Sequence, residues 1–338
     1  MKITITSGVD KKYKSEKIEK QKSNDSKIQL PQATKKNIIN PTNSLQEIFD
    51  ELEELIGLED VKAMIYEVHA FSEIQKRRAS AALANQPTVL HAIFKGNPGS
   101  GKTTVARLLA KLYKEMGILS KGHLLEIERA DLVGEYIGHT ALKTKEQIKK
   151  ALGGVMFIDE AYSLCRGGEK DFGREAIDAL VKAMEDNRND FVLVLAGYNK
   201  EMDDFLASNP GLNSRFPLHI DFPDYTLSEL LSIAKLMYHQ RQYQPSQEGW
   251  IELEKNLRRS LLLSDKNKAN ARGIRNIVEA SLRAQAVRLI NNKDLEELNK
   301  EDLKGISAED IKKAVQKTTH KNNVQAKENT RSVMNAVG

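Results

Sequence analysis

A glycine-rich loop followed by a lysine and two threonines is the first group of residues that could do chemistry. The stretch GNPGSGKTT has the spacing of a phosphate-binding loop (Walker A), and it stands between the apolar run LHAIFK and the helical segment TVARLLAKLYKEM. Its glycines let backbone N–H groups converge on a phosphate, and the helix that follows adds the positive end of its dipole. We expect Lys102 to pair with β- and γ-phosphates and Thr103 to ligate Mg²⁺. The predicted nucleotide-binding residues are Gly96, Asn97, Pro98, Gly99, Ser100, Gly101, Lys102, Thr103 and Thr104.

Two acidic residues end the apolar run VMFIDE (Walker B). An acid at the end of a buried strand lies on the sheet edge where ligands bind, so Asp159 is expected to hold hydrated Mg²⁺. Glu160 is ionised at neutral pH and could polarise an attacking water. The alternative is a surface carboxylate pair in a turn. Beside a phosphate loop, the pair predicts hydrolysis of a nucleotide rather than its storage.

Polar residues elsewhere could sense or stabilise the γ-phosphate. The run FVLVLAGYN ends in Tyr198 and Asn199; either could hydrogen-bond the attacking water, and Asn199 is favoured. Arg215 in NPGLNSRF, and Arg272 and Arg275 in NARGIRN, carry planar permanent charges that suit a transferring phosphoryl group. Taken alone, each arginine is more often an ion-pair residue.

The stretch DLVGEYIGHT places two large apolar residues, Tyr136 and Ile137, between Gly134 and Gly138. It follows the second predicted strand and precedes a helix that the capping pair Thr144 and Gln147 is expected to begin. Tyr136 could pack on its own domain, or it could be exposed on a mobile loop and grip a partner.

Short apolar runs alternating with helical segments predict how these residues are positioned. The runs indicate buried parallel strands joined by crossover helices, and therefore a three-layer α/β/α core with five strands over roughly residues 86–225. Two helices precede it. The first begins at a capping box of Ser44 and Glu47 and ends at about Glu54, and after an interruption at Gly57 a second continues to about Asn85. After Tyr225 no strand signal returns. A capping box at Thr226 and Glu229 begins a small all-helical domain, with helices expected near 227–243, 246–263, 273–292 and 307–317.

Composition and charge limit the functional classes. The chain has 338 residues, is 40% hydrophobic and carries a net charge of +5. Residues 1–41 hold ten lysines and four acidic residues, a net charge of +6, which leaves about −1 for the rest. A near-neutral body argues against a basic nucleic-acid groove. No apolar run is long enough to span a membrane, and Cys165 is the only cysteine, so we expect a cytoplasmic protein.

The domain organisation predicted from these patterns has four parts. We expect a basic disordered extension over 1–43, a nucleotide-binding domain over 44–225, a helical lid over 226–318 and a flexible tail over 319–338.

Five of these blocks together resemble the AAA+ ATPases, and more narrowly the CbxX/CfqX family, which includes red-type rubisco activases and a sporulation protein. They are FKGNPGSGKTTVARLLAKL, SKGHLLEIERADLVGEYIGHT, GGVMFIDEAYSL, LAGYNKEMDDFLASNPGLNSRF and NARGIRNIVEAS, and the similarity covers roughly residues 45–310. The segment GGEKDFGREAIDALVKAMED is similar to the sporulation branch.

The resemblance implies roles for individual residues. It implies that Ile56, Gly57 and Leu58 contact adenine, that Arg215 is an arginine finger acting on a neighbouring subunit's ATP, and that Arg272 is a second sensor within its own subunit. It also implies a homo-oligomeric ring, usually a hexamer, whose pore is lined by Tyr136, Ile137 and Gly138.

The leading hypothesis is therefore a ring-forming ATPase, with ATP and Mg²⁺ as ligands, that remodels an unidentified client polypeptide and acts in sporulation. No specific nucleic-acid partner is expected. The alternatives are a nucleic-acid loader or helicase-like ATPase, a nucleotide-dependent scaffold without work output, and a P-loop kinase.

Overall fold

The computed structural model describes residues 43–84, 89–136, 138–166, 172–262, 270–292 and 295–318. The predicted N-terminal extension, apart from Asn43, and the predicted C-terminal tail lie outside these residues. None of the described helices is both long and apolar enough to cross a membrane.

A five-stranded parallel sheet forms the centre of the nucleotide-binding part, with strand order β2-β3-β4-β1-β5. Strands β3 and β4 are buried along their whole length, which explains why they are continuous apolar runs rather than alternating ones. Because β3, β4 and β1 are neighbours, the segments that follow them meet at one edge of the sheet. All five predicted strands are present: β1 (Ala92–Gly96), β2 (Leu124–Ile127), β3 (Val155–Ile158), β4 (Val192–Gly197) and β5 (Leu218–Phe222).

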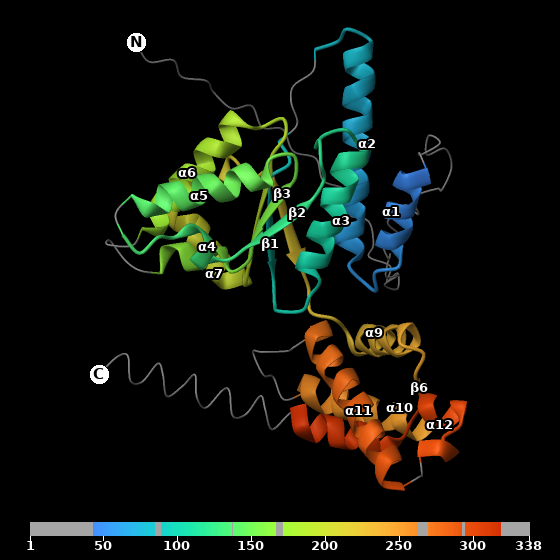
Figure 1. Cartoon of the computed structure of the whole chain (residues 1–338). Helices are drawn as coiled ribbons and strands as arrows, with labels where there is room; N and C mark the ends of the chain where they lie inside the picture. Colours follow the sequence, from blue (N-terminus) through green and yellow to red (C-terminus); the bar gives the residue numbers. More distant parts are fainter. Residues whose placement is uncertain are drawn as a thin grey trace, which may run out of the picture. The chain divides into compact units, whose positions relative to one another are not determined.

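Helices cover both faces of the sheet, as Figure 1 shows. Successive strand residues point to opposite faces, so Phe94 joins the apolar cluster under α1, α2 and α3 while Ile93 joins the cluster under α4 to α7. The predicted three-layer α/β/α architecture is confirmed. The covering helices are α1 (Asn43–Glu53), α2 (Glu59–Ser80), α3 (Lys102–Glu115), α4 (Arg129–Leu132), α5 (His139–Ala151), α6 (Gly173–Asp186) and α7 (Asn199–Ser208), with the short η1 (Ala161–Cys165) and α8 (Pro210–Asn213).

In the nucleotide-binding part, three predicted helix ends differ from the observed ones. Ser44 is already helical rather than the residue before α1, and its hydroxyl donates to Oε2 of Glu115 at 2.5 Å. Helix α2 ends at Ser80, before the predicted Asn85, because the chain turns at Ala82, which has a φ of 55°.

The third difference is the start of α5, which the sequence placed at Thr144. The helix begins at His139 instead, with Gly138 as its N-cap residue. Thr144 is fully buried, and its hydroxyl donates to the carbonyl oxygen of Leu132 at 3.3 Å. A threonine inside a helix can satisfy its hydroxyl in this way, so its presence alone did not mark a helix start.

The segment after β5 is helical, as predicted, except for one short strand pair. Thr226 begins α9 with the predicted capping box, in which its side chain and that of Glu229 bond each other's backbone N–H groups. Gln244–Pro245 (β6) pairs in parallel with Gly305–Ile306 (β7), a two-residue strand pair within the otherwise helical lid. Two paired residues are too few to leave a recognisable strand pattern. The helices are α9 (Leu227–Gln240), α10 (Gln247–Leu262), α11 (Asn270–Asn292), η3 (Leu295–Glu297), α12 (Lys300–Lys304) and a last helix over 308–318.

Candidate functional site

The glycine-rich loop connects β1 to α3 and wraps closely against the neighbouring strand. A Cβ atom at Gly96 would lie 2.5 Å from the carbonyl oxygen of Phe222, so only glycine fits there. Gly101 precedes the helix with a φ of 104°, a conformation that other residues rarely adopt. The loop is therefore folded back tightly at the N-terminal end of α3, where backbone N–H groups favour an anion.

Lys102 is the first residue of α3, and its side chain returns into the loop. Its Nζ donates to the carbonyl oxygens of Gly96 at 2.8 Å and Asn97 at 2.9 Å, and the residue is 8% exposed. Burial lowers the pKa of Lys102, and Asp159 acts in the opposite direction. The hydroxyl of Ser100 is fully buried and finds no hydrogen-bond partner among the described residues. A buried ammonium beside an unpaired hydroxyl fits a phosphate group.

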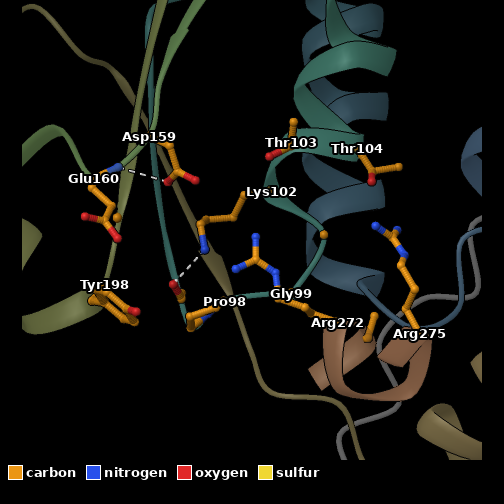
Figure 2. A pocket seen from close by; sticks show the side chains of 14 residues that line it. Pro98, Gly99, Lys102, Thr103, Thr104, Asp159, Glu160, Tyr198, Arg272 and Arg275 are labelled. Atoms are coloured by element: carbon orange, nitrogen blue, oxygen red, sulfur yellow. Dashed lines mark hydrogen bonds between the residues drawn. The ribbon is translucent and has the colours of Figure 1, made fainter. Parts of the chain in front are cut away.

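The two acidic residues follow β3 where the chain turns into η1. The N–H of Glu160 donates to Oδ1 of Asp159 at 2.9 Å, and Glu160 adopts a left-handed backbone with a φ of 48°. Such a conformation costs on the order of 1–3 kcal/mol in a residue other than glycine. It turns the Glu160 side chain away from Asp159, and Figure 2 shows both carboxylates at the edge of the same pocket as Lys102.

A cavity of about 230 Å³ brings together most of the phosphate loop and two of the predicted catalytic residues, Glu160 and Arg272. Thr103 and Asp159 both line it, and their oxygen atoms are of the kind that Mg²⁺ prefers. Two arginines from α11, Arg272 and Arg275, line it from the other side (Figure 2). The lining residues are Gly96, Pro98, Gly99, Gly101, Lys102, Thr103, Thr104, Asp159, Glu160, Gly197, Tyr198, Ala271, Arg272 and Arg275.

Tyr198, rather than Asn199, lines this cavity at the end of β4. Tyr198 is the last residue before α7, whereas Asn199 is the first residue of that helix and is exposed. Burial and the nearby carboxylate of Glu160 raise the pKa of Tyr198, so its phenol stays protonated and able to donate at neutral pH.

Arg215 does not line the cavity of its own chain. Its Nε and Nη2 atoms lie 3.0 and 2.6 Å from Oε1 of Glu185, and its Nη1 donates to the carbonyl oxygen of Gly211 at 2.8 Å. The side chain is 36% exposed. The guanidinium group is thus held at the surface by an ion pair within the chain.

The segment from Ile56 to Leu58 lies beside the phosphate loop but does not line the cavity. Leu58 approaches Gly101, with its Cδ1 3.2 Å from where a Cβ at Gly101 would be. Gly57 has a φ of 66°, and a Cβ there would lie 2.3 Å from a carboxylate oxygen of Glu229 in α9. The hydroxyl of Tyr225 donates to the carbonyl oxygen of Ser100 at 3.3 Å, so this corner joins three segments of the chain.

The loop that carries Tyr136 is pinned to α5. Tyr136 is 66% exposed, and its ring meets the ring of His139 edge-on at 5.4 Å. The N–H of Gly134 donates to the buried hydroxyl of Thr140 at 2.9 Å, and a Cβ at Gly134 would lie 2.5 Å from Cβ of His139. Gly134 therefore allows the loop to pack closely against the first turn of α5. Ile137 lies outside the described residues, and Gly138 has a φ of 82°.

Sequence comparison matches both parts of the chain to one family. The family described as "ATPase family associated with various cellular activities (AAA)" matches residues 92–224, and the AAA lid domain matches residues 226–321. Stage V sporulation protein K of Bacillus subtilis (strain 168) is 57% identical over 247 residues, which are 73% of this chain and 77% of that protein. This chain belongs to the AAA ATPases.

Other relatives of this AAA ATPase include CbxX proteins and a rubisco activase. The plasmid-encoded CbxX of Cupriavidus necator is 46% identical over 74% of this chain and 79% of its own length. The chloroplastic ribulose bisphosphate carboxylase/oxygenase activase of Cyanidioschyzon merolae is 46% identical over 72% of this chain and 84% of its own length. The resemblance to the CbxX/CfqX group predicted from the motifs is confirmed.

Among solved structures, the AAA domain of FIGL-1 in complex with ADP has the same fold. It matches with a TM-score of 0.54 and 16% sequence identity, covering 78% of this chain and 83% of that chain.

Two residues of this AAA ATPase that bond to the phosphate loop or to α11 were not predicted. Asp224 accepts hydrogen bonds from the side chain of Asn97, and Asn270 begins α11 with a φ of 37°. Asn270 does have a local signal, since an asparagine at the start of a helical segment can adopt the left-handed backbone conformation that most residues avoid. Nothing local in the sequence identifies Asp224.

Proposed function

We propose that this AAA protein hydrolyses ATP in a ring of identical subunits, a hexamer, and uses the motion to remodel a client polypeptide. The observation that carries the proposal is the convergence of Lys102, Asp159, Glu160 and Arg272 on one cavity, with Tyr198 beside them. These residues come from four segments of the chain, so their meeting reflects the fold rather than sequence proximity.

Each side chain has a role that its surroundings support. The phosphate loop and Lys102 bind the β- and γ-phosphates, and Thr103 and Asp159 hold Mg²⁺, which supplies positive charge against the phosphate oxygens. Glu160 orients an attacking water and accepts its proton as the water oxygen bonds to the γ-phosphorus and the bond to ADP breaks.

A donor to the attacking water or the γ-phosphate completes this set. The sequence favoured Asn199 for the role. The cavity favours Tyr198, because its side chain lines the site and remains a hydrogen-bond donor at neutral pH.

The ring is supported by the position of Arg215. A guanidinium group that stabilises the transferring phosphoryl group must reach it, yet Arg215 is 36% exposed and does not line its own cavity. We infer that Arg215 acts on the cavity of a neighbouring subunit and leaves its ion pair with Glu185 to do so.

The client-binding role is assigned to Tyr136. Its ring is 66% exposed, and Thr140 fixes the backbone of its loop. An exposed side chain on a fixed backbone can transmit a movement of the domain to a bound partner. By similarity to stage V sporulation protein K, the process is sporulation. The cytoplasmic location expected from the single cysteine remains a prediction.

Two substitutions test the proposed activity. Lys102→Ala should abolish ATP binding, because it removes the cation inside the phosphate loop. Glu160→Gln should bind ATP with Mg²⁺ and stop turnover, because the amide cannot accept the proton. Phosphate release and fluorescent-nucleotide binding measure the two effects, and an active Glu160→Gln protein would contradict the assignment.

The same phosphate-release assay separates a protein remodeller from a nucleic-acid motor. Unfolded polypeptide should stimulate the wild-type rate more than single-stranded DNA does. The opposite order would support the loader or helicase-like alternative.

A further inference from the structure

A small polar cluster joins the phosphate loop to the first turn of α11. It consists of Asn97 in the loop, Asp224 just after β5, and Asn270 at the start of α11. Only Asn97 belongs to the predicted nucleotide-binding residues, and neither Asp224 nor Asn270 lines the cavity.

The hydrogen bonds of the cluster use the side-chain amide of Asn270 fully. Its Nδ2 donates to Oδ1 of Asp224 at 2.7 Å and to the carbonyl oxygen of Pro98 at 3.5 Å, and its Oδ1 accepts from the N–H of Tyr225 at 3.1 Å. Asn270 is 6% exposed and has a φ of 37°, in the left-handed region that Asn tolerates better than most residues. Both the side chain and the backbone of this residue are therefore specified.

The same carboxylate also holds the phosphate loop. Asn97 donates through Nδ2 to both oxygens of Asp224, at 2.9 and 3.1 Å. One residue beyond Asn270, the N–H of Ala271 donates to the carbonyl oxygen of Gly99 at 3.1 Å. The first turn of α11 is thus bonded to the phosphate loop directly through Pro98 and Gly99 and indirectly through Asp224.

The cavity arginines follow immediately on this anchored turn. Arg272 lies two residues after Asn270, and Arg275 lies one turn further along α11. We propose that Asp224 and Asn270 are positioning residues that fix Arg272 in the nucleotide cavity and couple the phosphate loop to α11. The inference rests on the proposed function, because it assigns Arg272 to a bound nucleotide.

Reversing the polarity of the pair tests the proposal. Asn270→Asp places two carboxylates against each other at a contact of 2.7 Å and should lower kcat/KM for ATP and weaken ADP binding by about tenfold. Adding Asp224→Asn restores a donor and an acceptor between the two side chains, keeps an acceptor for Asn97 and Tyr225, and should recover most of the loss. Asn270→Gly, which keeps the left-handed backbone but lacks the amide, should resemble Asn270→Asp and serves if the charged variant does not fold.

A double-mutant cycle with Arg272→Ala distinguishes the positioning of Arg272 from a general contribution of Asn270 to the stability of the fold. If Asn270 acts through Arg272, Arg272→Ala should weaken binding of a non-hydrolysable ATP analogue with Mg²⁺ strongly in the wild-type background and little in the Asn270→Asp background. Equal losses in both backgrounds, wild-type kinetics for Asn270→Asp, or no rescue by Asp224→Asn would overturn the inference. ADP binding reports on the cluster even if the wild-type chain does not hydrolyse ATP, so failure of the proposed activity would be recognised separately.

Discussion

Replacement of Tyr136 by Ala separates client binding from folding. The side chain is 66% exposed, and its one aromatic contact within the described residues is with His139 at 5.4 Å. An aromatic pair contributes about 0.5–1.5 kcal/mol, and exposure places this one at the low end, so Tyr136→Ala should lower the free energy of unfolding by less than about 1 kcal/mol. It should nevertheless abolish client remodelling, because the substitution removes the exposed aromatic ring that is proposed to contact the client.

Tyr113 provides a matched control, because it is the same residue type in the opposite environment. It lies on α3 and is 1% exposed, so Tyr113→Ala should cost about 3–5 kcal/mol. Urea unfolding measures both free energies, and phosphate release with and without an unfolded polypeptide measures basal and stimulated turnover. A loss of stability in Tyr136→Ala comparable to that in Tyr113→Ala would make Tyr136 a packing residue, and retained stimulation would remove it from client binding.

The remaining predictions concern the Tyr136 loop and the core. Gly134→Ala should destabilise the protein by about 1–3 kcal/mol and reduce client stimulation, because the new methyl group would lie 2.5 Å from Cβ of His139. Gly138→Ala, where nothing lies within 4 Å of the added Cβ, should cost only the strain of its backbone conformation and is the control in the same unfolding assay. Burial lowers the pKa of His91 to about 4. Between about pH 6.5 and pH 4, the unfolded chain therefore binds a proton at His91 that the folded chain does not bind. Stability should therefore fall by roughly 2 kcal/mol from pH 7 to pH 5, and His91→Gln should remove that part of the pH dependence; an unchanged slope would refute the assignment to His91.

The sequence predicts the residues at the centre of the nucleotide site, because each of them belongs to a motif next to a single predicted strand or helix. Lys102 follows the glycines of the loop, and Asp159 and Glu160 follow a buried strand, so motif and element together place them. Tyr198 and Asn199 are adjacent, and which of them reaches the cavity depends on the residue at which α7 begins. Thr144 is a residue type that often caps helices, but it is buried inside α5. Its position depends on how α5 packs, which the local sequence does not show.

Contacts between distant parts of the chain are what the sequence does not predict. Asp224 bonds to residues 46 and 127 positions away, and nothing local in the sequence pairs it with either of them. The Arg215–Glu185 pair is likewise a product of folding, since 30 residues separate its members. These polar contacts depend on the finished sheet and on the position of α11.

In the proposed ring a neighbouring subunit completes each ATP site, and complementation between two inactive proteins can demonstrate this. Arg215→Ala retains Glu160 but lacks the finger, whereas Glu160→Gln retains the finger but cannot turn over. Each should be inactive alone, and an equimolar mixture should recover ATP hydrolysis at about a quarter of the sites, because that fraction pairs an intact Glu160 with an intact neighbouring Arg215. If the mixture releases phosphate no faster than either protein alone, or if Arg215→Ala alone turns over normally, Arg215 does not act on the ATP site of a neighbouring subunit.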